Sequence, residues 1–310
     1  FTVAVVGAGS VGATMAYAML VRGAARRVVL HDINAAKVRA EVLDLGHGAM
    51  FLPEADIDGS DDVEVCRGAD IVIVTAGAKQ KPGQSRMDLA GVTVDLMKKV
   101  LPGVQAVAPD ATFIMVTNPV DVVTYASLKI TGLPPNQLFG SGTVLDTSRL
   151  RWLVSEASDV AVANVHAYMA GEHGDTEVPL WSSATIGGVP LLEWESQTGR
   201  LGAVRRDEIS HRTVNAAYAV IEGKGATNYA VGLAGARIVE AIRRDENRVL
   251  PISTLLQDWH GITDVCMSVP TIVNGLGAGD RLRVPVSDEE LTKLRASADA
   301  IREQAHSLGF

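Results

Sequence analysis

The stretch VAVVGAGSVGATMAYA, residues 3–18, decides the fold of this chain. Gly7, Gly9 and Gly12 stand directly after an apolar run typical of a strand and directly before a helical pattern. In a dinucleotide-binding turn, the first glycine permits the tight turn, the second lets a pyrophosphate approach the backbone, and the third allows close packing of helix and strand. The phosphates then face the N-terminus of the helix, where free N–H groups and the helix dipole favour an anion.

A second apolar run, Arg27–His31, ends beside Asp32, which lies 20 residues after Gly12. An acid at this spacing hydrogen-bonds the ribose hydroxyls, and no adjacent arginine is present to bind a 2′-phosphate, so NAD is favoured over NADP. The alternative is that the glycines form an ordinary turn and that Asp32 only caps the next helix. Because spacing and context agree, we favour the NAD site, with further candidate contacts at Val11, Thr75, Ala76, Gly77 and Asn118.

Short apolar runs alternate with helical patterns over the first 140 residues or so. Strands are expected at Thr2–Val6, Arg27–His31, Ile71–Thr75 and Thr112–Thr117, and helices at Ser10–Val21, Asn34–Leu45 and Ser85–Val100. Strands that are apolar on both faces and separated by helices imply a parallel sheet covered on both sides.

After about residue 140 the pattern changes to longer helices mixed with short strands. Helices are expected at Arg205–Glu222, Gly232–Arg244 and Asp288–Leu308, the last one capped by Ser287, and strands near Leu250–Ser253 and Val265–Val269. We therefore predict an α/β fold with two parts. Residues 1–140 form a Rossmann-type doubly wound parallel sheet that binds NAD, and residues 141–310 form a mixed α+β catalytic domain.

The composition excludes several classes of protein. A net charge of −8 disfavours nucleic-acid binding, and 47% hydrophobic residues disfavour disorder. No apolar run approaches the roughly 18–20 residues of a membrane helix. Cys66 and Cys266 are isolated, which gives no disulfide framework and no metal-ligand spacing, so a reducing cytoplasm is expected. The chain begins at Phe1 in an expected strand; we expect no signal peptide and at least a missing initiator Met.

The segment AYMAGEHGDTEVPLWSS, residues 167–183, contains a candidate catalytic histidine, His173, directly after an apolar run. Oxidation of an alcohol by NAD sends a hydride to the cofactor and a proton to a base, and neutral histidine is suited to take that proton. Asp146, in the segment GSGTVLDTSRLRW, is the candidate anion that would fix the tautomer of His173 and raise its pKa. A single histidine is as often a core or surface residue, so this alternative stays open.

Arg149 follows Asp146 by three residues, so the two side chains project to nearly one face of a helix. A guanidinium at this place can hold a substrate carboxylate with two parallel hydrogen bonds. The alternative is an ion pair with Asp146 itself.

Taken together, the motifs VTNPVD, GSGTVLDTSRLR, GEHGDTEVPLWSS and EGKGATNYA resemble those of bacterial-type L-lactate dehydrogenases in the lactate/malate dehydrogenase family. The resemblance covers nearly the whole chain and implies NAD-dependent interconversion of pyruvate and L-lactate without a metal. It implies that His173 is the proton donor and acceptor, with Asp146 as its partner. It also implies four residues that contact the substrate. Arg149 binds the carboxylate, Arg86 polarises the C2 oxygen, Asn118 lies beside the substrate and the nicotinamide, and Thr227 lies near the methyl group.

The loop AGAKQKPGQSR, residues 76–86, is the segment that closes over the substrate in this family. Malate dehydrogenases of the family carry an arginine at the position of Gln80. A second carboxylate in a closed site would cost several kcal/mol if left unpaired, and the neutral amide of Gln80 does not pair it. Lys79 or Lys81 would serve that carboxylate only if turned inward. Because lysine is rarely buried without a partner, we favour pyruvate.

Arg151 and His166 match an arginine and a histidine that line the fructose 1,6-bisphosphate site of activated bacterial lactate dehydrogenases. There two subunits meet at a two-fold axis, so both pairs would form a cationic cluster that a bisphosphate neutralises. The alternative is a surface cation and a packed core histidine. The resemblance further implies a homotetramer and an allosteric enzyme of glycolysis and fermentation.

Three other functions remain open from the sequence. A malate or broad-specificity 2-hydroxyacid dehydrogenase differs in its rates with pyruvate and oxaloacetate. An NAD-dependent glycosidase would need a metal site, for which neither cysteine has a local histidine partner. A non-enzymatic NAD-binding protein would have little reason to combine His173, Asp146, Arg149 and Arg86.

Overall fold

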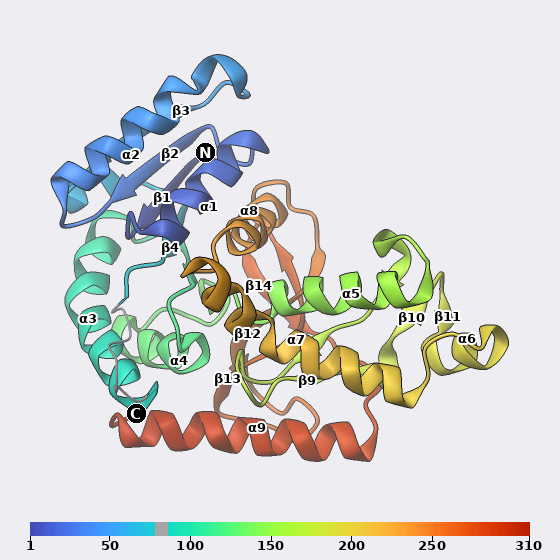
Figure 1. The fold of residues 1–310 in the computed structure, drawn as a ribbon. Helices are drawn as coiled ribbons and strands as arrows, with labels where there is room; N and C mark the ends of the chain where they lie inside the picture. Colours follow the sequence, from blue (N-terminus) through green and yellow to red (C-terminus); the bar gives the residue numbers. More distant parts are fainter. Residues whose placement is uncertain (78–85) are drawn as a thin grey trace.

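A nine-stranded sheet forms the centre of the molecule (Figure 1), in the order β14-β13-β12-β6-β5-β4-β1-β2-β3. The computed structural model describes residues 1–77 and 89–310 in full and residues 86–88 by their place in a helix. The strands of the large sheet are β1 Thr2–Val6, β2 Arg27–His31, β3 Asp56–Ser60, β4 Ile71–Val74, β5 Thr112–Met115, β6 Leu138–Gly140, β12 Arg248–Leu256, β13 Val265–Asn274 and β14 Gly277–Arg281.

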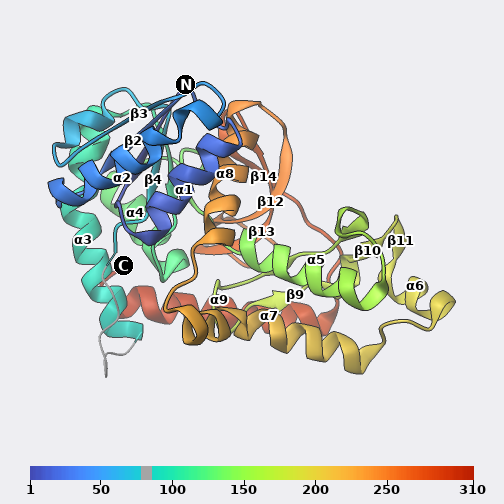
Figure 2. The same ribbon diagram turned by 45° about the horizontal axis from the view of Figure 1, so that its top comes forward.

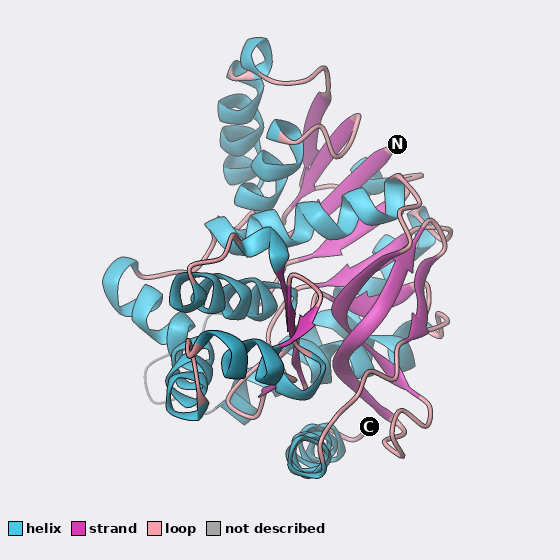
Figure 3. Ribbon diagram, turned by 90° about the vertical axis from the view of Figure 1, so that its right-hand side faces the viewer, coloured by secondary structure: helices cyan, strands magenta, loops and turns pink. Residues whose placement is uncertain are grey.

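The six strands from β3 to β6 are parallel and follow the doubly wound order 3-2-1-4-5-6. Helices cover both faces, and Figure 3 shows the strands in the middle of this arrangement. On one face Met15 and Met19 of α1 pack with Ile238 of α8, and on the other Met97 and Leu101 of α3 belong to a second core. The predicted Rossmann-type fold is confirmed.

The helices have these bounds: α1 Ser10–Val21, α2 Ala35–His47, α3 Arg86–Val107, α4 Val120–Thr131, α5 Val144–Ser158, α6 Leu191–Thr198, α7 Ala203–Lys224, α8 Tyr229–Arg243 and α9 Asp288–Ser307. Figure 2 shows α1 and α8 lying side by side, although they come from opposite halves of the chain. The smaller strands are β7 Val165–His166, β8 Met169–Ala170, β9 Val178–Pro179, β10 Thr185–Ile186 and β11 Val189–Pro190.

The large sheet continues across residue 140. Gly140 of β6 pairs with Ser253 of β12, and β12, β13 and β14 then add three antiparallel strands. The helix α9 packs against β13 and α4, and its start is fixed by a capping box between Ser287 and Glu290, as the sequence predicted for Ser287. The second half of the chain is therefore joined to the first by a shared sheet as well as by helices.

Most predicted elements are present with small shifts at their ends. β1, β2 and α1 have the predicted bounds, whereas β4 ends one residue earlier and β5 two residues earlier than predicted. The helix α3 continues to Val107 with Pro102 inside it, which extends it beyond the predicted end at Val100. No helix among the described residues is long and apolar enough to cross a membrane.

Candidate active site

The glycine turn after β1 has the geometry that a dinucleotide requires. Gly7 has a φ of +107°, and a Cβ on Gly12 would lie 1.9 Å from the carbonyl oxygen of Gly7. A Cβ on Gly9 would meet no atom within 4 Å, so the backbone there is open to a ligand. These residues fit a bound pyrophosphate: two glycines are needed by the fold, and the third leaves access to the N-terminus of α1.

Asp32 lies at the carboxyl end of β2 and contacts this turn. Its Oδ2 accepts a hydrogen bond from the backbone N–H of Ala8 at 2.8 Å, and its Oδ1 accepts one from Asn34 at 3.0 Å. The cap of α2 is Asn34, whose side chain accepts the N–H of Lys37. The alternative that Asp32 only caps the next helix is therefore wrong. Asn34 is the cap of that helix, and the carboxylate of Asp32 faces the glycine turn.

The other predicted cofactor contacts surround the same turn. Thr75 Oγ1 donates a hydrogen bond to the carbonyl oxygen of Gly7 at 2.9 Å, and Ala76 donates its N–H to Val6. Gly77 follows them at the end of β4, and Val11 lies in the first turn of α1. The switch point between β1 and β4, where strand order reverses, is thus lined by the predicted residues.

A cavity of about 250 Å³ contains four of the predicted site residues: Asn118, Asp146, Arg149 and His173. α5 supplies Asp146 and Arg149 from its first two turns, while His173 lies in the loop between β8 and β9. Its other lining residues are Leu89, Pro119, Glu172, Gly174, Asp175, Glu177, Val214, Ala217, Tyr218, Ile221 and Gln304.

His173 and Asp146 form a hydrogen-bonded pair. The distance from His173 Nδ1 to Asp146 Oδ2 is 2.6 Å, and the other carboxylate oxygen accepts a hydrogen bond from Arg149 at 2.6 Å. The side chain of Asp146 is only 3% exposed, whereas that of His173 is 25% exposed and borders the cavity. The Arg149 pair named above as an alternative is present, but Arg149 also lines the cavity and has further N–H groups to donate.

The charges of this cluster set its protonation. Burial alone would lower the pKa of His173, but the charge of Asp146 and the hydrogen bond to it outweigh burial and raise that pKa to about 9. For Asp146 burial acts in the opposite sense and is outweighed by His173 and Arg149, so the pKa of its carboxyl is lowered. A protonated His173 beside an ionised Asp146 has the chemistry to donate a proton to a carbonyl group that is being reduced.

Two residues of the site were missed in the sequence. Asp121 in α4 is 2% exposed, and its carboxylate accepts the backbone N–H of His173 at 2.7 Å and the hydroxyl of Ser253 at 2.6 Å. Glu177, four residues after His173, is 8% exposed and lines the cavity. Both lie inside motifs quoted above, VTNPVD and GEHGDTEVPLWSS, which were the available signal.

Other predicted residues lie elsewhere or cannot be placed. Thr227 is in the loop between α7 and α8 and is not among the residues that line the cavity. Arg86 is the first residue of α3. The predictions for Gln80, Lys79 and Lys81 lie outside the described residues.

The predicted effector residues are neighbours. Arg151 Nε donates a hydrogen bond to the carbonyl oxygen of Ala167 at 2.9 Å, directly after His166, and its guanidinium lies over the ring of Tyr168. His166 is exposed on β7, so it is not a packed core histidine. Burial, with the nearby charge of Arg248 as a smaller factor, lowers the pKa of Arg151 against the opposing effect of Tyr168. The two side chains therefore come from adjoining parts of one surface.

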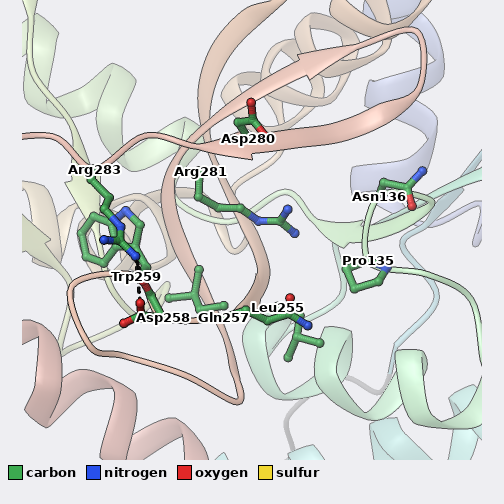
Figure 4. A pocket seen from close by; sticks show the side chains of 10 residues that line it. Pro135, Asn136, Leu255, Gln257, Asp258, Trp259, Asp280, Arg281 and Arg283 are labelled. Atoms are coloured by element: carbon green, nitrogen blue, oxygen red, sulfur yellow. Dashed lines mark hydrogen bonds and ion pairs between the residues drawn. The ribbon is translucent and has the colours of Figure 1, made fainter.

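A larger cavity of about 470 Å³ lies away from this chemistry (Figure 4). It is bordered by Asn136, Trp259, Arg281 and Arg283. Figure 4 shows Arg281 at the end of β14, Arg283 on the segment after it, Trp259 on the loop after β12 and Asn136 on the segment before β6. None of the predicted site residues borders it, so size alone does not identify the active site.

One cluster of metal-ligand types occurs among the described residues. Donor atoms of Asp146, His173 and Glu177 lie within 4.8 Å of one another. However, the 2.6 Å between His173 Nδ1 and Asp146 Oδ2 is a hydrogen-bond distance, shorter than the roughly 3.3 Å between two ligands of a tetrahedral zinc. The arrangement is that of an acid–base pair.

The chain matches two family models. Residues 1–140 match the lactate/malate dehydrogenase NAD binding domain, and residues 143–308 match the lactate/malate dehydrogenase alpha/beta C-terminal domain. It is 55% identical over 309 residues to an L-lactate dehydrogenase of Bifidobacterium animalis subsp. lactis, covering 99% of this chain and 97% of that protein. It is 47% identical over 302 residues to an L-lactate dehydrogenase of Acetivibrio thermocellus, covering 97% and 95%.

Solved structures agree with this relationship. The crystal structure of a lactate dehydrogenase from a Medee basin deep-sea metagenome library superimposes with a TM-score of 0.97 at 34% identity, covering 100% of this chain and 99% of that one. A minor L-lactate dehydrogenase of Enterococcus mundtii gives 0.96 at 36% identity, with 99% and 98% covered. The chain belongs to the lactate/malate dehydrogenase family. Within it the chain is of the bacterial L-lactate dehydrogenase type, an NAD-dependent oxidoreductase.

Proposed function

We propose that this enzyme interconverts pyruvate and L-lactate and that His173 moves the proton. The observation that carries the proposal is the hydrogen-bonded His173–Asp146 pair in a cavity that Arg149 also lines. When bound, NAD supplies the nicotinamide that accepts or donates the hydride. The chain must then bind a carboxylate, orient the C2 carbon and move one proton.

We assign each of these three tasks to particular residues. Arg149 binds the substrate carboxylate with the N–H groups that Asp146 leaves free. Protonated His173 donates its Nε2 proton to the C2 oxygen during pyruvate reduction and takes it back during lactate oxidation. Asp146 holds the ring through Nδ1 and stabilises the imidazolium. By family resemblance, Arg86 polarises the C2 oxygen, Asn118 orients the substrate, and Gln80 and Thr227 contact its methyl side.

Loss of NADH absorbance on addition of pyruvate tests this function. We expect a rate with pyruvate at least about 10²-fold above that with oxaloacetate, because Gln80 leaves a second carboxylate unpaired. A higher rate with oxaloacetate would instead identify a malate or broad 2-hydroxyacid dehydrogenase. No rate with either substrate would contradict the proposal.

We also propose that fructose 1,6-bisphosphate activates the enzyme through Arg151 and His166. Support comes from their adjacent positions, from the exposure of His166, and from the nearby charge of Arg248. A bisphosphate would neutralise the cations that two subunits bring to a two-fold axis, and so favour the active quaternary state. Pyruvate saturation curves with and without the bisphosphate, at acid and neutral pH, test the proposal; superimposable curves would contradict it.

A homotetramer accompanies this proposal. Its support is the exposure of two large apolar side chains on α8, Tyr229 and Leu233, which a second copy of the chain would cover. Sedimentation of the purified protein measures the subunit number. We keep the division at residues 140 and 141 and the cytoplasmic location, with roles in glycolysis and fermentation, as proposals of the same kind.

A further inference from the structure

Glu177 is a buried acid in the wall of the substrate cavity. It lies directly before β9 and borders the cavity together with Arg149 and His173. The residue is 8% exposed, and its Oε2 is buried without a hydrogen-bond partner among the described residues. A buried polar atom without a partner costs free energy, so a purely structural role does not account for an acid at this position.

Charged groups face Glu177 from several elements. Asp146 and Arg149 come from α5, His173 from the loop after β8, and Asp121 from α4. Carboxylate oxygens of Glu177 and Asp146 and a ring nitrogen of His173 lie within 4.8 Å of one another. An ionised Glu177 would therefore be a second anion next to Asp146.

We propose that Glu177 sets the affinity for the substrate: as a neutral acid it leaves Arg149 to the substrate carboxylate, and as an anion it competes for that arginine. The proposal rests on the proposed function, since it requires a substrate with a carboxylate. An anion in the wall also repels the incoming carboxylate, and the enclosed cavity strengthens that repulsion. Uptake of a carboxylate substrate then requires the neutral form of Glu177.

The environment keeps Glu177 neutral at physiological pH. Burial, followed by the charge of Asp146, raises the pKa of Glu177 to about 9, while His173 and Arg149 oppose the shift. The substrate-competent form is thus dominant at pH 7 and is lost as the pH rises through about 9. Above that pH the apparent KM increases by the inverse of the neutral fraction, about tenfold at one unit beyond the pKa.

Lactate oxidation separates this effect from the titration of His173. The oxidation needs neutral His173 as a base, so loss of its proton at alkaline pH raises the rate. Ionisation of Glu177 acts in the opposite sense and raises KM. In the pyruvate direction both titrations lower activity over the same pH range, which makes that direction unsuitable.

The test is the pH dependence of KM and kcat between pH 7 and 10.5 for wild type, Glu177→Gln and the matched control Glu193→Gln, an exposed acid of α6. The substrate is the 2-hydroxy acid that the wild type oxidises at pH 8. We expect KM of the wild type and the control to rise about tenfold between pH 8 and 10. KM of Glu177→Gln should change less than about threefold over this range. Its kcat should still rise as His173 loses its proton, but at a lower pH than in the wild type, because glutamine cannot ionise and so cannot raise the pKa of His173.

Identical KM curves for wild type and Glu177→Gln would overturn the proposal. If the glutamine variant does not fold, Glu177→Asp carries the test, because the shorter acid changes its burial and must shift the alkaline rise of KM. An unshifted rise would overturn the proposal as well. Failure of the wild type to oxidise any 2-hydroxy acid contradicts the proposed function instead, so the two failures are distinguishable.

Discussion

The carboxylate of Asp121 accepts the backbone N–H of His173 at 2.7 Å, across 52 positions of sequence. Its second oxygen accepts the hydroxyl of Ser253 in β12, which places Asp121 between the first and second halves of the chain. The loop that carries His173 is thus held through its main chain by one side chain of α4. Burial raises the pKa of this carboxyl to about 6, against the hydrogen bonds and the charge of His173 that lower it.

Asp121→Asn should weaken catalysis and alter the pH dependence of stability. An asparagine has one accepting oxygen in place of two, so it cannot accept from both the His173 N–H and the Ser253 hydroxyl. The two contacts must rearrange and shift the His173 loop, and we expect a fall in kcat of up to about 10²-fold. In the wild type the folded pKa of Asp121 lies above its unfolded value. The free energy of unfolding therefore falls relative to the variant as the pH rises from about 4 to 7, by about 2 kcal/mol over this range.

Urea unfolding of both proteins at pH 4, 5, 6 and 7 measures this difference. Exposed Asp110 supplies a matched control, since Asp110→Asn should leave kcat unchanged and keep the wild-type pH dependence. A constant difference in stability between wild type and Asp121→Asn at all four pH values would contradict the buried-charge account.

Gln80→Arg should shift the substrate preference toward oxaloacetate. An arginine pairs the second carboxylate of oxaloacetate in a closed site, where leaving it unpaired costs several kcal/mol, so kcat/KM for oxaloacetate relative to pyruvate should rise about 10²-fold or more. Steady-state rates with both substrates give the ratio. Lys79→Gln is the control and should leave the ratio unchanged, because we expect this lysine in water. A variant that retained the pyruvate preference would refute charge pairing as the basis of specificity.

The fold was largely predictable because its core strands carry a local signal. β1 and α1 follow directly from the valine run and the glycine turn, and their bounds agree with the prediction. β3 was missed because its sequence, DIDGS, is polar and contains glycine. It is an edge strand whose order comes from pairing with β2, where Asp56 lies opposite Arg27. Pairing of this kind depends on tertiary contacts that a local pattern does not contain.

The site was predictable where the chemistry requires an uncommon residue pattern. His173, Asp146 and Arg149 were predicted, and the structure brings them into one cavity. Asp121 and Glu177 were not, because an acid in the first turn of a helix and an acid beside a strand are both common at the surface. These two acids are buried only because α4 and the segment before β9 pack into the interior around the cavity. The roles that we propose for them depend on burial, which the sequence alone did not indicate.

Glu240→Ala should lower stability without affecting the site. Glu240 in α8 is 2% exposed; it receives two hydrogen bonds from Arg22, the C-cap residue of α1, at 2.7 and 2.8 Å and one from Arg237 at 2.8 Å. Removal of a buried partner costs about 3–5 kcal/mol, and we expect the lower end because Arg22 is partly solvated and Arg237 keeps Glu246.

Urea unfolding at one fixed protein concentration measures the loss, since subunit association would otherwise contribute. The exposed pair of Glu64 and Arg67 offers the control: Glu64→Ala should cost about 0–1 kcal/mol. Equal losses for Glu64→Ala and Glu240→Ala would show that burial does not strengthen the contact between α1 and α8.

Two glycines of the turn should respond differently to the same methyl group. In Gly12→Ala the new Cβ would lie 1.9 Å from the carbonyl oxygen of Gly7, so α1 must move away from β1. We expect a loss of about 3 kcal/mol or more in the free energy of unfolding of Gly12→Ala, measured with urea.

In Gly9→Ala the Cβ meets no protein atom within 4 Å, so the urea midpoint should fall only slightly, by the lower preference of alanine for the N-cap of α1. The methyl group would instead occupy the approach of the pyrophosphate and raise the Kd for NADH at least about tenfold, or 1.4 kcal/mol. Gly46→Ala in α2, also in open space, should leave the Kd for NADH unchanged and slightly increase stability. A wild-type Kd for Gly9→Ala, measured by NADH fluorescence, would mean that the pyrophosphate does not pass over this turn, whatever happens to Gly12→Ala.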